Sequence, residues 1–246
     1  MKEILELKDI SAGYEQTTVL QGVNVAIREK DFIGIIGPNG GGKTTLLKVI
    51  LGLIKPFSGK IVYHTSKQSL FGYLPQNSKF DARFPISVKE VVMSGLMSEK
   101  GIFRSYTKAD RVKVEEILEK YGMGEYKNRP IGELSGGQMQ RVFLCRAIIS
   151  SPKILILDEP STYVDSNFEI EFYSLLKELN ERMSIVMVSH DLGTICSYVK
   201  TIACVNRGLH YHESNLITPE QLKLYNCPIE LISHGTVPHR VLLNHD

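Results

Sequence analysis

Long apolar runs along the chain predict strands that are buried on both faces. Residues 32–36, 154–157 and 184–189 consist mainly of Ile, Leu and Val, a pattern typical of a parallel sheet covered on both sides. Residues 2–28 and 59–63 instead alternate between apolar and polar side chains, which favours antiparallel strands. The pattern therefore predicts a parallel core sheet with a small antiparallel β-lobe.

Apolar residues at helical spacing predict helices around these strands. From residue 45 to residue 53 the apolar side chains recur with the period of a helix that has one buried face. The whole stretch 78–150 has a helical pattern, and Ser87 stands three residues before Glu90, as in a capping box. We expect a strand, a loop and a helix near the N-terminal third and a separate helical lobe in the middle.

A glycine-rich stretch joins the first core strand to its helix and fits the pattern G-x-x-x-x-G-K-[ST]. Its glycines allow several backbone N–H groups to converge on one anion. The lysine adds a point charge at the β and γ phosphates of a nucleotide, and the threonine hydroxyl completes a magnesium shell. A glycine-rich turn that binds nothing is the alternative. The residues expected to bind nucleotide here are Gly37, Pro38, Asn39, Gly40, Gly41, Gly42, Lys43, Thr44 and Thr45.

Polar residues directly follow the other two core runs. Asp158 and Glu159 end the run 154–157, and His190 ends the run 184–189. Open α/β sheets bind their ligands at the carboxyl ends of the strands. There Asp158 can hold magnesium through its water shell, Glu159 can polarise an attacking water, and His190 can bind a γ-phosphate. Surface side chains without a role are the alternative interpretation.

A second candidate anion site lies at a predicted helix start. Ser135, Gly136 and Gly137 precede Gln138, which opens a stretch of good helix formers that stops near Pro152. A helix start with a serine hydroxyl and exposed glycine amides attracts anions, because its N–H groups carry a partial positive charge. The chain thus has two segments suited to phosphate groups.

Together, the glycine loop, the acidic pair and the sequence 134–138 resemble the nucleotide-binding subunits of ABC (ATP-binding cassette) transporters. The resemblance covers nearly the whole chain. It implies an α/β fold with a P-loop NTPase core of the ABC ATPase type, an antiparallel β-lobe and an inserted helical lobe. One nucleotide-binding domain then spans 1–246. Its expected parts are a core with the β-lobe at 1–77 and 151–215, a helical signature lobe at 78–150, and a short C-terminal extension at 216–246.

The resemblance also assigns expected roles to single residues. Tyr14 is similar to the aromatic residue that stacks on adenine, although an ordinary half-buried tyrosine is the alternative. Gln76 looks like the glutamine that senses the γ-phosphate and the magnesium ion, and Asp165 like the acid of a loop that crosses to a second subunit. Ser135 and its neighbours would engage the ATP of that other subunit. Two chains would then hold two MgATP head to tail.

Charge and composition narrow the expected partners. With 29 basic and 27 acidic residues the net charge is only +2, so we expect no nucleic acid partner. The four cysteines show no metal-type or disulfide spacing, which suggests a reducing cytoplasm. No apolar stretch approaches the roughly 20 residues that cross a bilayer. The resemblance therefore implies a separate integral membrane permease, an extracytoplasmic substrate-binding protein as an indirect partner, and a peripheral location at the cytoplasmic face of the membrane.

The permease contact is expected near 80–97. In the family, the groove between the helical lobe and the core receives a helix of the membrane partner. Apolar side chains supply adaptable surface there, or are buried within the lobe instead. The residues in question are Phe84, Val92, Met93, Leu96 and Met97.

The expected cargo follows from similarity alone. Segments 84–95, 190–194 and 234–240 look like the branch of ABC importers that serves zinc, manganese or iron. Import of a metal chelate or a vitamin, export with a separate membrane subunit, a soluble ABC ATPase outside transport, and a regulatory cassette that does not hydrolyse ATP are the alternatives.

Histidines gather in the C-terminal part of the chain. Five of the seven histidines are His210, His212, His234, His239 and His245. In an extended segment, two histidines separated by one residue point to the same side. We expect solvated surface side chains here, and a regulatory metal site is a hypothesis.

Overall fold

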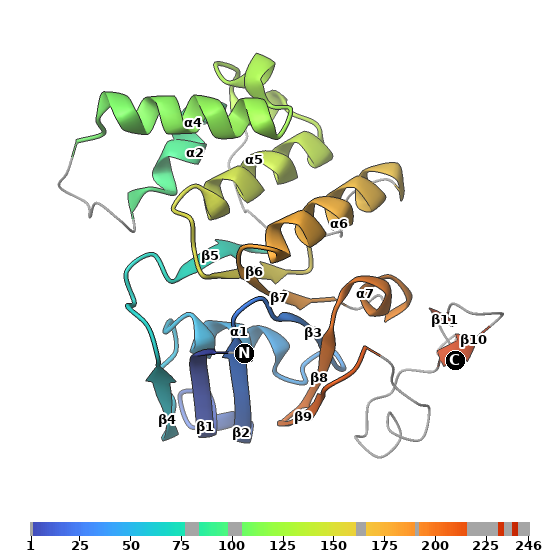
Figure 1. The fold of residues 1–246 in the computed structure, drawn as a ribbon. Coiled ribbons are helices and arrows are strands. Elements are labelled where there is room, and N and C mark those ends of the chain that lie inside the picture. The colour runs from blue at the N-terminus through green and yellow to red at the C-terminus, as the bar shows by residue number, and fades with distance from the viewer. Residues whose placement is uncertain are drawn as a thin grey trace. The chain divides into compact units, whose positions relative to one another are not determined.

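The computed structural model describes residues 2–76, 84–97, 105–160, 166–189, 192–215, 231–233 and 238–240 of the 246. The chain divides into two compact units (Figure 1). The first comprises Met1–Thr65 and Asn180–Asp246, and the second comprises Ser66–Leu179. The finer division into core, signature lobe and extension that the sequence suggests stays a prediction.

An antiparallel sheet of three strands forms the β-lobe of the first unit. β1 (Glu3–Tyr14) lies between β2 (Thr17–Arg28) and β4 (Ser58–Tyr63). Apolar side chains of β1 and β2, such as Leu7 and Leu20, are buried beneath the sheet. The antiparallel strands predicted from the alternating pattern are therefore confirmed.

A second sheet in this unit carries the long apolar runs. β3 (Phe32–Ile36) runs parallel to both β7 (Ser184–Val188) and β8 (Thr201–Asn206), and β9 (Gly208–His212) pairs antiparallel with β8. Every residue of β3 and β7 is buried, which explains why neither strand alternates in sequence. Two further strands, β10 (Leu231–Ser233) and β11 (Pro238–Arg240), pair with each other.

Two helices belong to the same unit. α1 (Lys43–Ile50) begins directly after the glycine loop, and α7 (Leu192–Tyr198) packs on β3, where a Cβ added to Gly34 would lie 2.8 Å from Ile195 Cδ1. The helical sequence pattern extends to residue 53, but α1 ends at Ile50. Gly52 follows with a φ of 74°, a left-handed conformation that ends helices.

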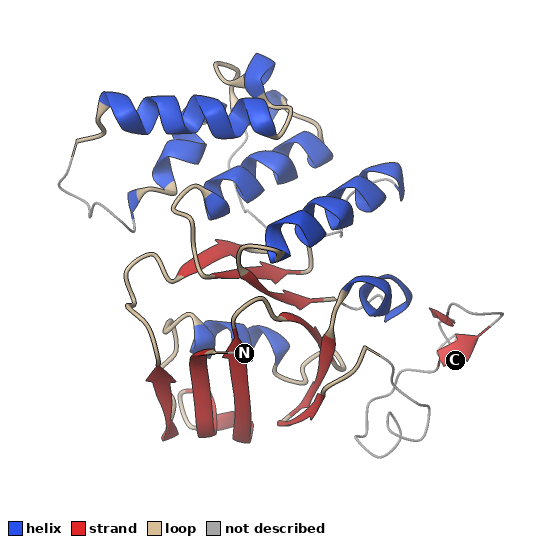
Figure 2. Ribbon diagram, in the orientation of Figure 1, coloured by secondary structure: helices blue, strands red, loops and turns tan. Residues whose placement is uncertain are grey.

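Figure 2 shows the second unit as mainly helical in the part that the structure describes. α2 (Val88–Ser94), α4 (Lys108–Lys120) and α5 (Gly136–Ile148) contact one another. A Cβ on Gly95 would lie 2.1 Å from the carbonyl oxygen of Arg146, so the end of α2 lies directly against α5. The other elements are β5 (Phe71–Leu74), which is parallel to β6 (Ile154–Asp158), the helix α6 (Ser166–Asn180), and the 3-10 helices η1 (Gly124–Tyr126) and η2 (Ile131–Glu133).

The helix starts of this unit follow the sequence closely. The capping box expected at Ser87 and Glu90 is present at the start of α2, and an equivalent box joins Thr107 to Asp110 at the start of α4. The side-chain oxygen of Thr107 accepts a 3.3 Å hydrogen bond from the backbone N–H of Asp110. Among the described residues, no helix combines the length and the apolar character needed to span a bilayer.

Candidate nucleotide site

The glycine loop is packed closely against its neighbours at several of its glycines. A Cβ on Gly37, whose φ is 150°, would lie 2.0 Å from the carbonyl oxygen of Val205 at the end of β8. Gly42 has a φ of 104°, and a Cβ there would lie 2.7 Å from Leu20 Cδ2 on β2. The glycines therefore let the loop lie directly on two strands, in addition to turning the chain.

The start of α1 is open to an anion. Its N-cap is Gly42, which has no side chain to accept a hydrogen bond from the first-turn N–H groups, and no acidic residue stands in the first turn. Thr44 is exposed in that turn, while Thr45 is buried. A helix start of this kind presents N–H donors and a partial positive charge to a phosphate group.

Lys43 is buried within the loop. Its Nζ donates hydrogen bonds of 2.9 Å to the carbonyl oxygen of Gly37 and 3.0 Å to that of Pro38. Carbonyl dipoles offset part of the cost of burying an ammonium group, but a phosphate would neutralise it with a full charge. The loop thus holds a cation at the position where the sequence predicts the β and γ phosphates.

The sequence did not predict one contact that holds the glycine loop in place. The backbone N–H of Arg207, in the turn between β8 and β9, donates a 3.0 Å hydrogen bond to the carbonyl oxygen of Gly41. The carbonyl oxygen of Arg207 accepts a 2.8 Å bond from the backbone N–H of Gln21 on β2. Arg207 therefore ties the loop to β2. No sequence signal marks this contact, because only backbone atoms make it.

Tyr14 lies at the end of β1 with 45% of its surface exposed, beside α1. Lys48 Nζ donates a 3.1 Å hydrogen bond to the Tyr14 hydroxyl and lies 5.4 Å from the ring centroid. Partial burial works to raise the pKa of the Tyr14 phenol, but hydrogen bonds with Lys48 and Thr45 outweigh it, so the pKa is lowered. The ring is thus anchored through its hydroxyl to the helix that follows the loop, and remains accessible to a flat ligand.

In the second unit, two predicted catalytic residues are in direct contact. Gln76 Nε2, just beyond β5, donates a hydrogen bond to Glu159 Oε2, just beyond β6. Glu159 is buried and has a φ of 51°, a conformation that non-glycine residues seldom adopt. Asp158, the last residue of β6, is buried as well. Burial raises the pKa of the nearby Tyr73 phenol, and the negative charge of Asp158 raises it further.

The predicted signature segment forms the start of α5. Ser135 Oγ accepts a 3.3 Å hydrogen bond from the backbone N–H of Gln138, and Gln138 Oε1 accepts a 3.0 Å bond from the backbone N–H of Ser135. A Cβ on Gly137 would lie 2.8 Å from Cδ2 of Phe168 in α6, so a side chain there would be crowded. The helix start has no acidic residue in its first turn. Ser135 and Gln138 hence also serve as a helix cap, alongside their predicted contact with nucleotide.

Two predicted site residues, Asp165 and His190, lie outside the described residues, and their roles stay predictions. The glycine loop belongs to the first unit, and Gln76, Asp158 and Glu159 belong to the second. Their expected joint action on one nucleotide stays a prediction as well.

Comparison with known proteins identifies the family. Residues 20–162, more than half of the chain, match the sequence profile of the ABC transporter family. The chain belongs to the ABC transporter family. This ABC cassette is accordingly an ATPase, its nucleotide is ATP, and its fold is the P-loop ABC ATPase fold that the sequence predicts.

Several ATP-binding proteins resemble the cassette over most of its length. It is 41% identical over 223 residues to the zinc uptake system ATP-binding protein ZurA of Listeria monocytogenes, covering 87% of each chain. It is 38% identical to a probable metal transport system ATP-binding protein of Thermotoga maritima, covering 95% of each. It is 37% identical to the high-affinity zinc uptake system ATP-binding protein ZnuC of Bacillus subtilis, covering 83% of the cassette and 92% of that protein.

Solved structures agree with this fold. An ABC transporter assigned to the metal-chelate type, in an inward-facing conformation, superposes with a TM-score of 0.84 at 26% identity, covering 99% of the cassette and 98% of that chain. A bacterial ABC transporter cassette solved as a dimer superposes with a TM-score of 0.73 at 25% identity, covering 87% of the cassette and all of that chain.

The two histidines of β9 share one face of the strand, as the sequence predicts for an extended segment. His210 and His212 are two residues apart in a strand and so lie on the same face. Burial lowers the pKa of His212, and the neighbouring His210 lowers it further. Within the described ranges, neither belongs to a group of three converging metal-ligating side chains. The hypothesis of a regulatory metal site in the C-terminal part therefore stays a prediction.

Proposed function

We propose that this cassette is the ATP-hydrolysing motor subunit of an importer for a transition metal ion, namely zinc, manganese or iron. The observation that carries the proposal is the 37–41% identity to the ATP-binding proteins of two zinc uptake systems and of one probable metal transport system, from three different organisms. Import of a metal chelate is the second candidate, because the superposed inward-facing transporter is assigned to the metal-chelate type.

MgATP fits the donors that the chain offers. Magnesium prefers oxygen ligands, and the Thr44 hydroxyl, the Asp158 carboxylate and the Gln76 amide oxygen are of that kind. When bound, magnesium neutralises charge on the β and γ phosphates. Lys43 and the N–H groups at the start of α1 bind the same phosphates, and Tyr14 stacks on the adenine ring.

Hydrolysis in this proposal depends on Glu159. Its carboxylate orients and polarises the attacking water, and the hydrogen bond from Gln76 holds the carboxylate in place. His190 donates a hydrogen bond to the γ-phosphate, which positions this group for attack.

The working unit is a pair of ATPase subunits on a membrane permease. Two cassettes meet head to tail, so that Ser135, Gly136 and Gly137 of each engage the ATP held by the other, and Asp165 crosses the interface. ATP is then part of the interface, which explains how binding drives closure and hydrolysis permits opening. The dimeric bacterial cassette supports the pairing of two cassettes.

The apolar residues expected at the permease contact differ in their exposure. Phe84 and Met97 expose 60% and 44% of their surfaces, whereas Val92 and Leu96 are fully buried within the second unit. We therefore infer that the exposed pair contributes to the contact and the buried pair does not. This contact lies on the cytoplasmic face of the membrane, and a substrate-binding protein delivers the metal on the opposite face.

Metal content of metal-starved source cells tests the proposal. The chromosomal copy is replaced by the wild type, by Glu159→Gln, or by Lys60→Ala, in which an exposed lysine on β4 is removed as a control. We expect Glu159→Gln to lower one metal selectively and Lys60→Ala to leave all three unchanged. Equal contents of zinc, manganese and iron in all strains would refute metal import while leaving the ATPase assignment intact.

A further inference from the structure

An irregularity in β1 brings two acidic side chains to one face of the β-lobe. Residues three apart in a regular strand point to opposite faces. The register of β1 against β2 shifts between Glu3 and Leu5, so that Glu3 pairs with Arg28 and Leu5 with Ile27. This bulge buries both Ile4 and Leu5. Glu3 and Glu6 are left partly exposed together, with 38% and 25% of their side-chain surfaces accessible.

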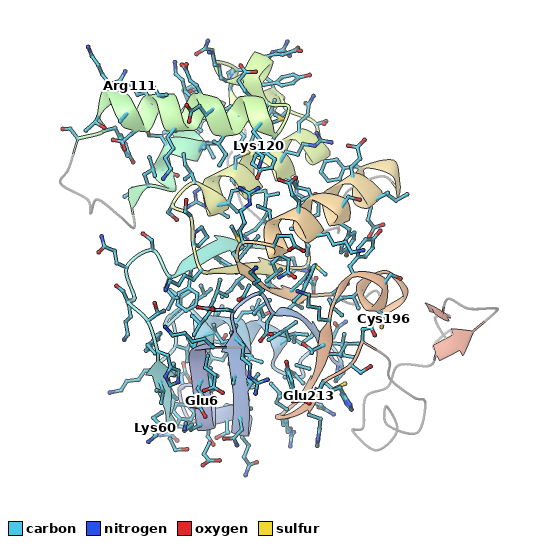
Figure 3. All side chains as sticks on the ribbon, viewed as in Figure 1. Glu6, Lys60, Arg111, Lys120, Cys196 and Glu213 are labelled. Carbon is cyan, nitrogen blue, oxygen red and sulfur yellow. The ribbon has the colours of Figure 1, made fainter. Side chains whose placement is uncertain are left out.

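A histidine from the neighbouring strand joins them. His64 follows β4, and its backbone N–H donates a 2.9 Å hydrogen bond to the carbonyl oxygen of Ile4, which fixes it beside β1. Its Nε2 lies 3.7 Å from Glu3 Oε2 and 3.6 Å from Glu6 Oε2. Figure 3 labels Glu6 on this sheet.

These separations suit a shared metal ion. Zinc binds imidazole nitrogen and carboxylate oxygen at about 2.0–2.2 Å, so two ligands of a tetrahedral site lie about 3.4 Å apart. The three ligand atoms lie within 4.8 Å of one another, and within the described ranges this is the one group of three His, Cys, Asp or Glu side chains that converges in this way.

Two basic side chains compete for the same carboxylates. Lys8 Nζ lies 2.9 Å from Glu6 Oε2, and Arg28 Nε lies 3.9 Å from Glu3 Oε1. Exposed ion pairs of this kind are weak, so a metal ion can replace them.

We propose that Glu3, Glu6 and His64 form a surface binding site for a divalent transition metal ion, with water completing the coordination shell. A mixed set of one imidazole and two carboxylates favours zinc and its neighbours over magnesium or calcium, which prefer oxygen ligands alone. The site shares no residue with the nucleotide site and does not depend on the cargo proposed above. A bound ion links β1 to the residue after β4 and stabilises the β-lobe.

Zinc titration of the full chain without nucleotide tests the site. After treatment with a chelator, isothermal titration should show one zinc ion bound per chain, undisturbed by millimolar magnesium. His64→Ala and Glu6→Gln should each weaken binding at least tenfold, since even outer-shell partners of a metal ligand are worth about 10- to 100-fold. Lys8→Met should strengthen binding, because it removes the competing ammonium group. His210→Ala, a control within the β9 pair, should leave the affinity unchanged.

The His210→Ala control distinguishes zinc binding at this site from binding at the C-terminal histidines. Two further measurements detect loss of folding. Circular dichroism and ATP turnover of each variant should match the wild type. Absence of zinc binding to the wild type, an affinity unaffected by His64→Ala, or a loss caused by His210→Ala would each overturn the proposal.

Discussion

At the scale of single residues, the backbone of Glu159 is the most unusual feature of the proposed catalytic group. A non-glycine residue in the left-handed region costs about 1–3 kcal/mol and persists only where its surroundings enforce it. Glu159 is held in this conformation with a φ of 51°, is buried, and accepts a hydrogen bond from Gln76. A carboxylate fixed in this way is suited to orienting a water molecule.

Glu159→Gln should separate ATP binding from hydrolysis. Glutamine preserves size and hydrogen bonding but cannot act as a base, so steady-state phosphate release should fall at least about 100-fold. ATP affinity should stay close to that of the wild type, because Lys43 and the loop are unchanged. Phosphate release and equilibrium ATP binding measure the two effects.

The same variant should accumulate a closed dimer in ATP, since the nucleotide at the interface is not consumed. Gel filtration with and without ATP checks this. A protein that elutes only as a monomer in ATP would contradict the head-to-tail mechanism, and undiminished turnover would remove Glu159 from its proposed role.

At the scale of elements, the glycine loop depends on close packing against β2 and β8. Gly37→Ala should therefore destabilise the fold by more than the roughly 1–2 kcal/mol expected for left-handed strain alone, because the new Cβ would overlap the Val205 carbonyl. Gly52→Ala is the matched control, since Gly52 also has a positive φ but no atom within 4 Å of an added Cβ. Urea unfolding of both variants gives the comparison. Equal losses would show that the packing against Val205 is not required.

The start of α5 combines a helix cap with the predicted signature contact, and a second helix allows the two roles to be separated. Thr107 caps α4 through a 3.3 Å hydrogen bond of the same kind as that of Ser135 on α5. Ser135→Ala and Thr107→Ala should each cost about 1 kcal/mol of unfolding free energy. Only Ser135→Ala should also reduce ATP-dependent dimer formation and turnover. If Thr107→Ala reduced turnover equally, the effect of Ser135 would be that of a cap alone.

At the scale of the whole molecule, the sequence predicted the features that depend on neighbouring residues, namely buried strands and helix caps. β3 and β7 are buried on both faces and are therefore continuous apolar runs, and the cap at Ser87 depends on Glu90, three residues later. The family resemblance supplied the fold class and the ATPase activity, which are confirmed. The roles of the site residues stay predictions.

Contacts between distant segments gave no comparable signal. The bond from Gln76 to Glu159 spans 83 positions. Arg207 ties the loop to β2 with backbone atoms that any residue possesses. Glu3 and Glu6 belong on opposite faces by strand periodicity, and only the bulge in β1 places both beside the distant His64. Each of these features depends on a contact or a backbone irregularity that exists only in the folded chain.

In the proposed function, ATP hydrolysis that depends on Glu159 powers the entry of one transition metal. The most direct test is the initial rate at which metal-starved source cells take up radioactive zinc, manganese and iron. Wild type and Lys60→Ala should take up one of the three metals rapidly, whereas Glu159→Gln should fall to the background of cells that lack the cassette. Uptake rates that do not differ between wild-type and Glu159→Gln cells, for zinc, manganese and iron alike, would contradict metal import driven by ATP hydrolysis.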